Sequence, residues 1–256
     1  MTATLVLPGR FNGPPASANG GYAAGRLAAL VDSDDAVEVT LRRPPPLGRE
    51  LVVAGGDDGG VRLLDGADVV AEARPATLDL DAPSAAVAFA EARAATRRPD
   101  DFPDHPFRMC FGCGPDRDPA EAVRILAGPV PGRDGLFAAA WTPPVALAGP
   151  DGLLPPEMSW VALDCPSSAP VEPPGSGVHV LGRLTARVAA PLRAGEEHVV
   201  VAWALGREGR KGYGASAVLD ADGVVRAIGR AVWIALQPPE STRHDSASAS
   251  GAAQTR

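Results

Sequence analysis

Two segments of this chain repeat one another, and this internal repetition limits its fold more than any other feature. Thr, Arg, Pro and Leu recur at the same places in Val39–Leu47 and Leu184–Leu192, at an offset of 145 residues. Leu64–Val70 matches Leu219–Val225 in the same way, at an offset of 155 residues. Matches in a constant order are typical of a duplicated unit. We therefore expect two related halves, the second with about ten added residues (155 − 145) near positions 206–212.

Each half also shows the same succession of expected elements. An extended apolar run (Thr4–Leu7, Leu136–Trp141) precedes a Pro-Pro loop and then a helix (Asn19–Val31, Pro156–Cys165). Proline and an acid favour the start of the second helix, and Pro166 favours its end. Three strands joined by Gly/Asp turns follow in each half. One helix and an antiparallel meander form an α+β layout, in which the sheet buries one face against the helix.

The pattern divides the chain into four segments. The first unit is expected over residues 1–82 and the second over residues 120–238. A linker over residues 83–119 joins them and contains an Ala/Arg-rich helix over 85–97. The polar tail 239–256 is rich in Ser and Ala and is expected to be disordered.

Charge and hydropathy exclude several classes of protein. Lys and Arg total 24 against 31 Asp and Glu, so the net charge is −7, which argues against a general nucleic-acid binder. No run of about 18 apolar residues predicts a membrane span. The N-terminal apolar run lacks the basic flank and the cleavage site of a signal peptide. The three cysteines are too few, and odd in number, for a disulfide framework. We expect a cytoplasmic protein with no membrane partner.

The motifs and their duplication resemble tandem (double) hotdog proteins of the acyl-CoA thioesterase superfamily. Asn19–Tyr22 resembles the Gly-Gly helix start of TesB-like type II acyl-CoA thioesterases, and Leu41–Gly48 resembles a strand end of the same proteins. Cys110–Pro115, Trp141–Pro143 and Trp160–Pro166 resemble motifs of single-domain thioesterase-like hotdog proteins.

This resemblance covers about residues 1–80 and 107–237. It implies two hotdog repeats, each a long helix wrapped by an antiparallel sheet, and hydrolysis of acyl-CoA thioesters bound between the helices. The expected partner is a small-molecule acyl thioester, in which CoA is part of the substrate, and no separate cofactor is expected. Exposed strand edges are compatible with a homo-oligomer.

Two carboxylates on the second helix are the first catalytic candidates. Asp164 lies in an apolar run, where an ionisable side chain is costly unless it is paired or functional. The resemblance places a water-positioning aspartate on this helix. Glu157 precedes it by seven residues, on the same helix face, but an acid is also ordinary in a first helical turn. Trp160 and Val161 lie between them and either line an acyl tunnel or belong to the core.

The start of the first helix is the expected site for the thioester carbonyl. Gly20 and Gly21 would let a ligand approach bare backbone N–H groups, and Asn19 is a good helix N-cap with or without a ligand. Tyr22 follows as a substrate-binding candidate. Arg210 and Lys211, in the added segment, would hold the phosphates of CoA or form a solvated turn.

Cys110 and Cys113 form a C-x-x-C pair with His105 upstream. Structural zinc requires four ligands, so this is half a site, and we expect no metal. Cys165 and His179 are distant in the sequence and would join the pair only through folding. The alternative is a pair of buried thiols in the loop that enters the second unit.

One departure from the family pattern opens two further hypotheses. The strand around Asp222–Arg230 lacks the glutamine that these thioesterases carry, and Arg226 and Arg230 stand near its place. Ser216 and Thr185 are the candidate hydroxyl donors. The second hypothesis is therefore a non-catalytic acyl-binding hotdog protein. The third is a hotdog hydratase or dehydratase, which would need a histidine such as His179 beside its carboxylate.

Overall fold

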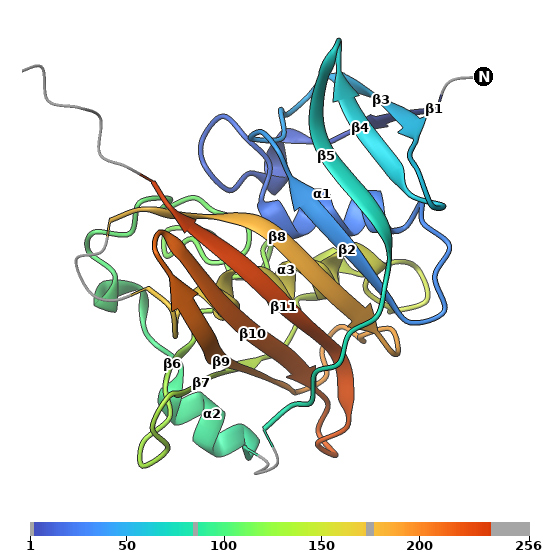
Figure 1. The fold of residues 1–256 in the computed structure, drawn as a ribbon. Coiled ribbons are helices and arrows are strands. Elements are labelled where there is room, and N and C mark those ends of the chain that lie inside the picture. The colour runs from blue at the N-terminus through green and yellow to red at the C-terminus, as the bar shows by residue number, and fades with distance from the viewer. Residues whose placement is uncertain (1–2, 84–86, 173–176, 237–256) are drawn as a thin grey trace, which may run out of the picture.

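The computed structural model describes residues 3–83, 87–172 and 177–236 (Figure 1). In this part of the chain one antiparallel sheet of eleven strands is accompanied by three α-helices. The expected tail 239–256 lies outside the described residues. The strands are β1 (Ala3–Val6), β2 (Ala36–Leu41), β3 (Glu50–Gly55), β4 (Val61–Asp65), β5 (Asp68–Ala76), β6 (Gly128–Pro129), β7 (Leu136–Trp141), β8 (His179–Val188), β9 (His198–Glu208), β10 (Lys211–Leu219) and β11 (Val225–Ala235).

Both halves have the same strand order. The first is β1-β3-β4-β5-β2 and the second is β7-β9-β10-β11-β8, with β6 at the outer edge. The halves join where β2 and β8 pair antiparallel, with Val39 opposite Leu184. These two residues are 145 positions apart, which is the offset of the first sequence match. If a two-fold axis relates β2 to β8, one residue of β2 must lie opposite its own equivalent in β8, and Val39 and Leu184 are such a pair.

Each half carries one helix of nine residues, α1 (Gly20–Ala28) and α3 (Pro156–Asp164). α1 is shorter than the helix expected over Asn19–Val31, whereas α3 ends one residue before the expected Cys165. Neither is the long helix that the resemblance implies. The side chain of Asn19 caps α1 by accepting from the amide of Tyr22. Since Pro166 has no N–H and cannot extend an α-helix, α3 continues only as the 3-10 turn Cys165–Ser168.

The residues added to the second half lengthen a hairpin instead of forming a loop. Glu208 pairs with Lys211 across a turn of two residues, so β9 and β10 continue their ladder almost to the tip. β9 has eleven residues where β3 has six. The inserted loop expected near residues 206–212 is therefore the end of this hairpin.

The two faces of the second half of the sheet are both covered. Val200 packs into the core cluster that holds α1 and α3, whereas its neighbours Val199 and Val201 pack with α2 (Phe89–Ala95) on the other face. A strand buried on both faces needs apolar residues at every position, which explains the unbroken valine run. No helix in the described ranges is long and apolar enough to cross a membrane.

Helices α1 and α3 approach each other backbone to backbone. A Cβ atom on Gly21 would lie 2.5 Å from the carbonyl oxygen of Trp160, and one on Gly25 would lie 2.7 Å from the Cα atom of Glu157. Only glycine fits at these two places. The small residues of α1 therefore serve the helix crossing, and this crossing brings the start of α1 to the end of α3.

We predict that Gly21→Ala lowers the free energy of unfolding by about 1–3 kcal/mol, because the added methyl group must separate the helices. Gly9→Ala is the matched control, since a Cβ there meets no atom within 4 Å. It should change stability by less than about 0.5 kcal/mol. Urea unfolding followed by circular dichroism measures both, and equal effects of the two substitutions would contradict the tight crossing.

Candidate functional site

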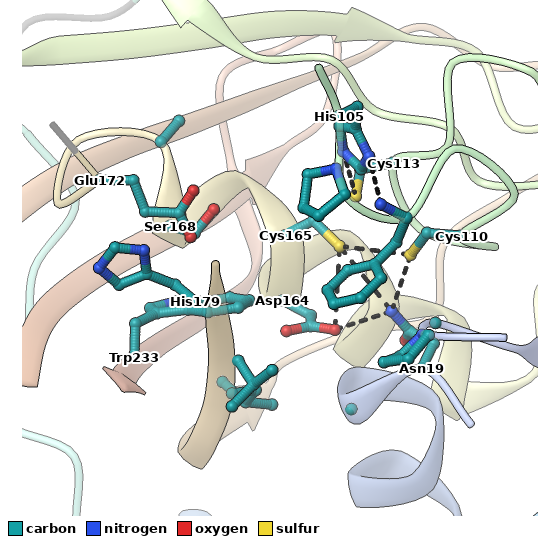
Figure 2. A pocket seen from close by; sticks show the side chains of 18 of the residues that line it. Asn19, His105, Cys110, Cys113, Asp164, Cys165, Ser168, Glu172, His179 and Trp233 are labelled. Atoms are coloured by element: carbon teal, nitrogen blue, oxygen red, sulfur yellow. Dashed lines mark hydrogen bonds between the residues drawn. The ribbon is translucent and has the colours of Figure 1, made fainter. Parts of the chain in front are cut away.

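A cavity of about 990 Å³ lies where the two halves meet the linker. It is bordered by the start of α1, the end of α3, the loop over residues 101–107 and the first residues of β8. Figure 2 shows the three cysteines and Asn19 on one side of Asp164, and His179 and Glu172 on its other side. The polar and sulfur-bearing side chains of the lining include Asn19, His105, Cys110, Cys113, Asp164, Cys165, Glu172 and His179.

Asp164 is buried at the end of α3, and its two oxygens have different surroundings. Oδ2 accepts hydrogen bonds from the amide of Gly21, at 2.9 Å, and from Nδ2 of Asn19, at 2.8 Å. Oδ1 accepts from no group in the described residues. A buried carboxylate oxygen without a partner is costly, and such atoms are characteristic of functional sites. Asp164 is therefore held through one oxygen, and its other oxygen is buried without a partner in the described residues.

Burial raises the pKa of Asp164 from its ordinary value to about 7, because the charged form loses its solvation. The Gly21 amide acts in the opposite direction, and the negative charge of Cys110 adds to the increase. A carboxyl group with a pKa near neutrality can both take up and release a proton at physiological pH, as general acid–base chemistry requires.

The backbone amides at the start of α1 differ in their hydrogen-bond partners. The Gly21 amide already binds Asp164, and the side chain of Asn19 accepts from the Tyr22 amide at 2.9 Å. The Gly20 amide donates to no atom of the described residues, and Gly20 lines the cavity. Of the three residues predicted to polarise a carbonyl, Gly20 therefore supplies the open donor at a helix N-terminus.

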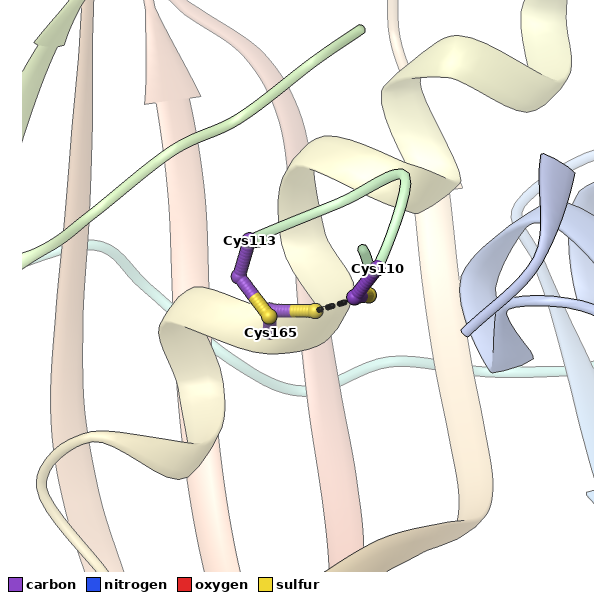
Figure 3. A group of neighbouring side chains, drawn as sticks. All are labelled: Cys110, Cys113 and Cys165. Carbon is purple, nitrogen blue, oxygen red and sulfur yellow. Dashed lines mark hydrogen bonds between the residues drawn. The ribbon is translucent and has the colours of Figure 1, made fainter. Parts of the chain in front are cut away.

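A third thiol joins the C-x-x-C pair. Folding places Cys165, which follows Asp164, with its sulfur 4.0 Å from that of Cys110 (Figure 3). Hydrogen bonds from the Cys113 and Cys165 thiols hold the pKa of Cys110 well below its ordinary value, and raise their own pKa values. The pair that looked like half a site in the sequence is therefore part of a larger group.

The other predicted site residues do not line the cavity. Glu157 lies two turns before Asp164, with Oε1 3.9 Å from Nε of Arg26. Tyr22 stacks on Phe11 in the core, with ring centroids 3.9 Å apart. The remaining residues are Trp160 and Val161, which are buried in the core, and Arg210 and Lys211, which are exposed at the end of the β9–β10 hairpin.

The hydroxyl candidates also have structural partners away from the cavity. Ser216 donates to the carbonyl of Leu163 at 2.6 Å, and Thr185 donates to Glu38 at 3.4 Å. Neither lines the cavity. Both hydroxyl groups are therefore engaged in hydrogen bonds within the fold.

The sequence did not single out Glu172 and Trp233, and gave His179 only a minor role. His179 is buried beside the cavity, and its Nδ1 atom has no partner in the described residues. Burial raises the pKa of Glu172, and the electrostatic interaction with His179 opposes this change. These residues belong to a loop and to two strands with no common motif, so only the fold reveals that they meet.

Comparison with known proteins places this arrangement in a structural class. No family model and no curated protein matches the sequence. The dehydratase domain of a mycocerosic acid synthase-like polyketide synthase is similar in structure, with a TM-score of 0.61, 15% identity, and 93% of this chain and 91% of that domain covered. Acyl-CoA thioesterase II TesB2 from Mycobacterium marinum has a TM-score of 0.53 and 13% identity, with 92% of this chain and 93% of that protein covered. A hotdog-fold protein from Alicyclobacillus acidocaldarius has a TM-score of 0.51 and 13% identity, with 93% of this chain and 97% of that protein covered.

The shared fold is the hotdog fold, and this chain has it. The similarity extends over nearly the whole length of the chain and of each protein compared.

We predict that Asn19→Ala lowers the free energy of unfolding by about 1–2 kcal/mol, because it removes both the cap of α1 and a donor to the buried Asp164. Asn19→Ser keeps a capping oxygen and should lose less. Urea unfolding of the two variants separates the contributions. Equal losses would show that the cap contributes little and that the bond to Asp164 dominates.

Proposed function

We propose that the chain consists of two hotdog repeats and hydrolyses acyl thioesters, with acyl-CoA as the substrate class. The repeated strand order and the Val39–Leu184 register support the duplication. The observation that carries the activity is the asymmetric environment of Asp164, a carboxylate fixed through one oxygen at the border of a cavity. The thioesterase among the similar structures supports the choice of substrate class.

The proposed reaction uses two groups of this chain. Oδ1 of Asp164 accepts a proton from a water molecule, and the water oxygen attacks the thioester carbonyl carbon. The Gly20 amide donates to the carbonyl oxygen, on which negative charge accumulates in the tetrahedral intermediate. When the C–S bond breaks, the leaving thiolate takes the proton from Asp164. The products are the carboxylic acid and the free thiol, and the carboxylate is restored.

We predict that Asp164→Asn lowers the rate of thiol release by about 10²–10⁴-fold, the range that a positioned general base contributes. The asparagine oxygen can still accept from Gly21 and Asn19, so stability should stay within about 1 kcal/mol of the parent. A panel of short-, medium- and long-chain acyl-CoAs with a thiol reagent measures the rate. Full activity of a folded Asp164→Asn protein would remove Asp164 from the mechanism.

The role of the Gly20 amide can be isolated with a pair of substitutions. Gly20→Pro removes this N–H at the first helical position, where proline is tolerated, and Asn19 already has a backbone conformation suited to a following proline, with φ −56° and ψ 134°. Gly20→Ala keeps the N–H and adds the same Cβ atom, which approaches Leu181 in both variants.

We predict that Gly20→Pro hydrolyses acyl-CoA about 10²–10³-fold more slowly than Gly20→Ala, as expected for loss of one donor to the oxyanion. The comparison is made in kcat, so that crowding near Leu181, common to both variants, cancels. Equal kcat values would assign carbonyl polarisation to another group.

Two observations favour a second candidate, hydration or dehydration of an acyl thioester. His179 lines the same cavity as Asp164, and a dehydratase domain is among the similar structures. Hydration of an enoyl-CoA that is lost in His179→Ala, without thiol release, would support this candidate over hydrolysis. Tight acyl-CoA binding without either reaction would identify a non-catalytic acyl-binding protein.

A further inference from the structure

The sulfur atoms of Cys110, Cys113 and Cys165 form a compact group at the border of the cavity. All three lie within 4.8 Å of one another, and the Cys110–Cys165 distance is 4.0 Å (Figure 3). Zinc binds thiolates at about 2.3 Å, so two sulfurs of a tetrahedral site lie about 3.8 Å apart. The distances between the three sulfur atoms are therefore close to those of a zinc site.

The turn over residues 110–114 carries two of these sulfurs, and its glycines allow the backbone and the third thiol to come close to it. The amide of Gly114 donates to the carbonyl of Cys110 at 2.8 Å, and a Cβ atom on Gly114 would lie 2.5 Å from the carbonyl oxygen of Arg108. A Cβ atom on Gly112 would lie 2.9 Å from the sulfur of Cys165. Glycine at both places lets the turn fold tightly and lets the third thiol reach it.

Each sulfur also lies beside a polar hydrogen. Nδ2 of Asn19 is 3.7 Å from the sulfur of Cys110 and 3.8 Å from that of Cys165. Nε2 of His105 is 3.5 Å from the sulfur of Cys113. Nδ1 of His105 accepts from the amide of Phe107 at 3.1 Å, so the proton of the neutral ring lies on Nε2. His105 is thus a donor to the sulfur and not a metal ligand.

We propose that Cys110, Cys113 and Cys165 bind a zinc ion as thiolates. Zinc binding would deprotonate the three thiols, and the surrounding donors are those that metal-bound sulfurs receive from an outer shell. No fourth His, Cys, Asp or Glu side chain joins the group among the described residues. All three cysteines line the cavity, so water or a ligand atom from the cavity completes the tetrahedron, the pattern of an open zinc site.

A disulfide between Cys110 and Cys165 is the competing interpretation. It would use two of the three sulfurs and would leave Cys113, with its His105 donor, unexplained. The convergence of all three side chains, two beside the same Asn19 nitrogen and the third beside His105, favours the metal.

The test uses the full chain, purified under reductant, and requires no turnover, so it is independent of the proposed hydrolysis. We expect about one zinc ion per chain by elemental mass spectrometry. Replacement with Co²⁺ should give thiolate-to-metal charge-transfer bands and the visible bands of a tetrahedral ion. The three thiols should react slowly with a thiol reagent until a chelator is added.

Variants separate the ligands from their neighbours. Cys113→Ser should lose the metal, and His105→Phe should weaken zinc binding about 10–100-fold in competition with a chelator, as loss of an outer-shell donor does. Met109→Ala is the matched control, because this neighbouring sulfur side chain is half exposed and outside the group, and it should bind zinc as the parent does.

Three results would overturn the assignment. The first is absence of stoichiometric zinc both as purified and after incubation with Zn²⁺ under reductant. The second is equal thiol reactivity of the unsubstituted protein with and without chelator, a measurement that stands even where Cys113→Ser fails to fold. The third is an intramolecular disulfide together with no zinc binding after reduction, which would assign the thiols to redox chemistry.

Discussion

The close crossing of α1 and α3 is the constraint on which the rest of this structure depends. Because Gly21 has no side chain, the first turn of α1 lies against the backbone of Trp160, and its amide reaches the carboxylate of Asp164. The same approach brings Asn19 within hydrogen-bond distance of that carboxylate. One steric condition thus places a helix start from the first half beside a carboxylate from the second, and the cavity opens next to both.

The sequence predicted the parts of the fold that depend on local pattern and repetition. The offset between matching segments identified β2 and β8 as equivalent strands, and they pair at the centre of the sheet. The extended run expected over Leu136–Trp141 has the same bounds as β7. Local pattern did not supply the end of α1, which stops at Ala28 and not at Val31, whereas α3 ends within one residue of the expected Cys165. Local pattern also missed that the added residues extend a hairpin ladder, because strand pairing is decided by the partner strand and not by the turn-like Gly and Arg residues.

In the candidate site, too, local sequence pattern indicated some residues, and others come together only through the fold. Asp164, Asn19 and Gly20, which line the cavity, became candidates because an acid in an apolar run and a glycine pair at a helix start are unusual locally. Trp160 shares the helix with Asp164, but periodicity gives only a face, and α1 occupies the side on which Trp160 lies. His179 and Cys165 reach the cavity through the path of the chain after α3, and a single sequence contains no signal for that path.

Asn19 connects the carboxylate and the sulfur group through one nitrogen. Its Nδ2 atom has two hydrogens and three acceptors within reach, Oδ2 of Asp164 at 2.8 Å and the sulfurs of Cys110 and Cys165 at 3.7 and 3.8 Å. The short bond uses one hydrogen, and the two sulfurs share the other. Any change of charge on the sulfurs, by metal binding or by oxidation, therefore alters the donor that also holds Asp164. The chemistry of the thiols and the position of the carboxylate are linked by this side chain.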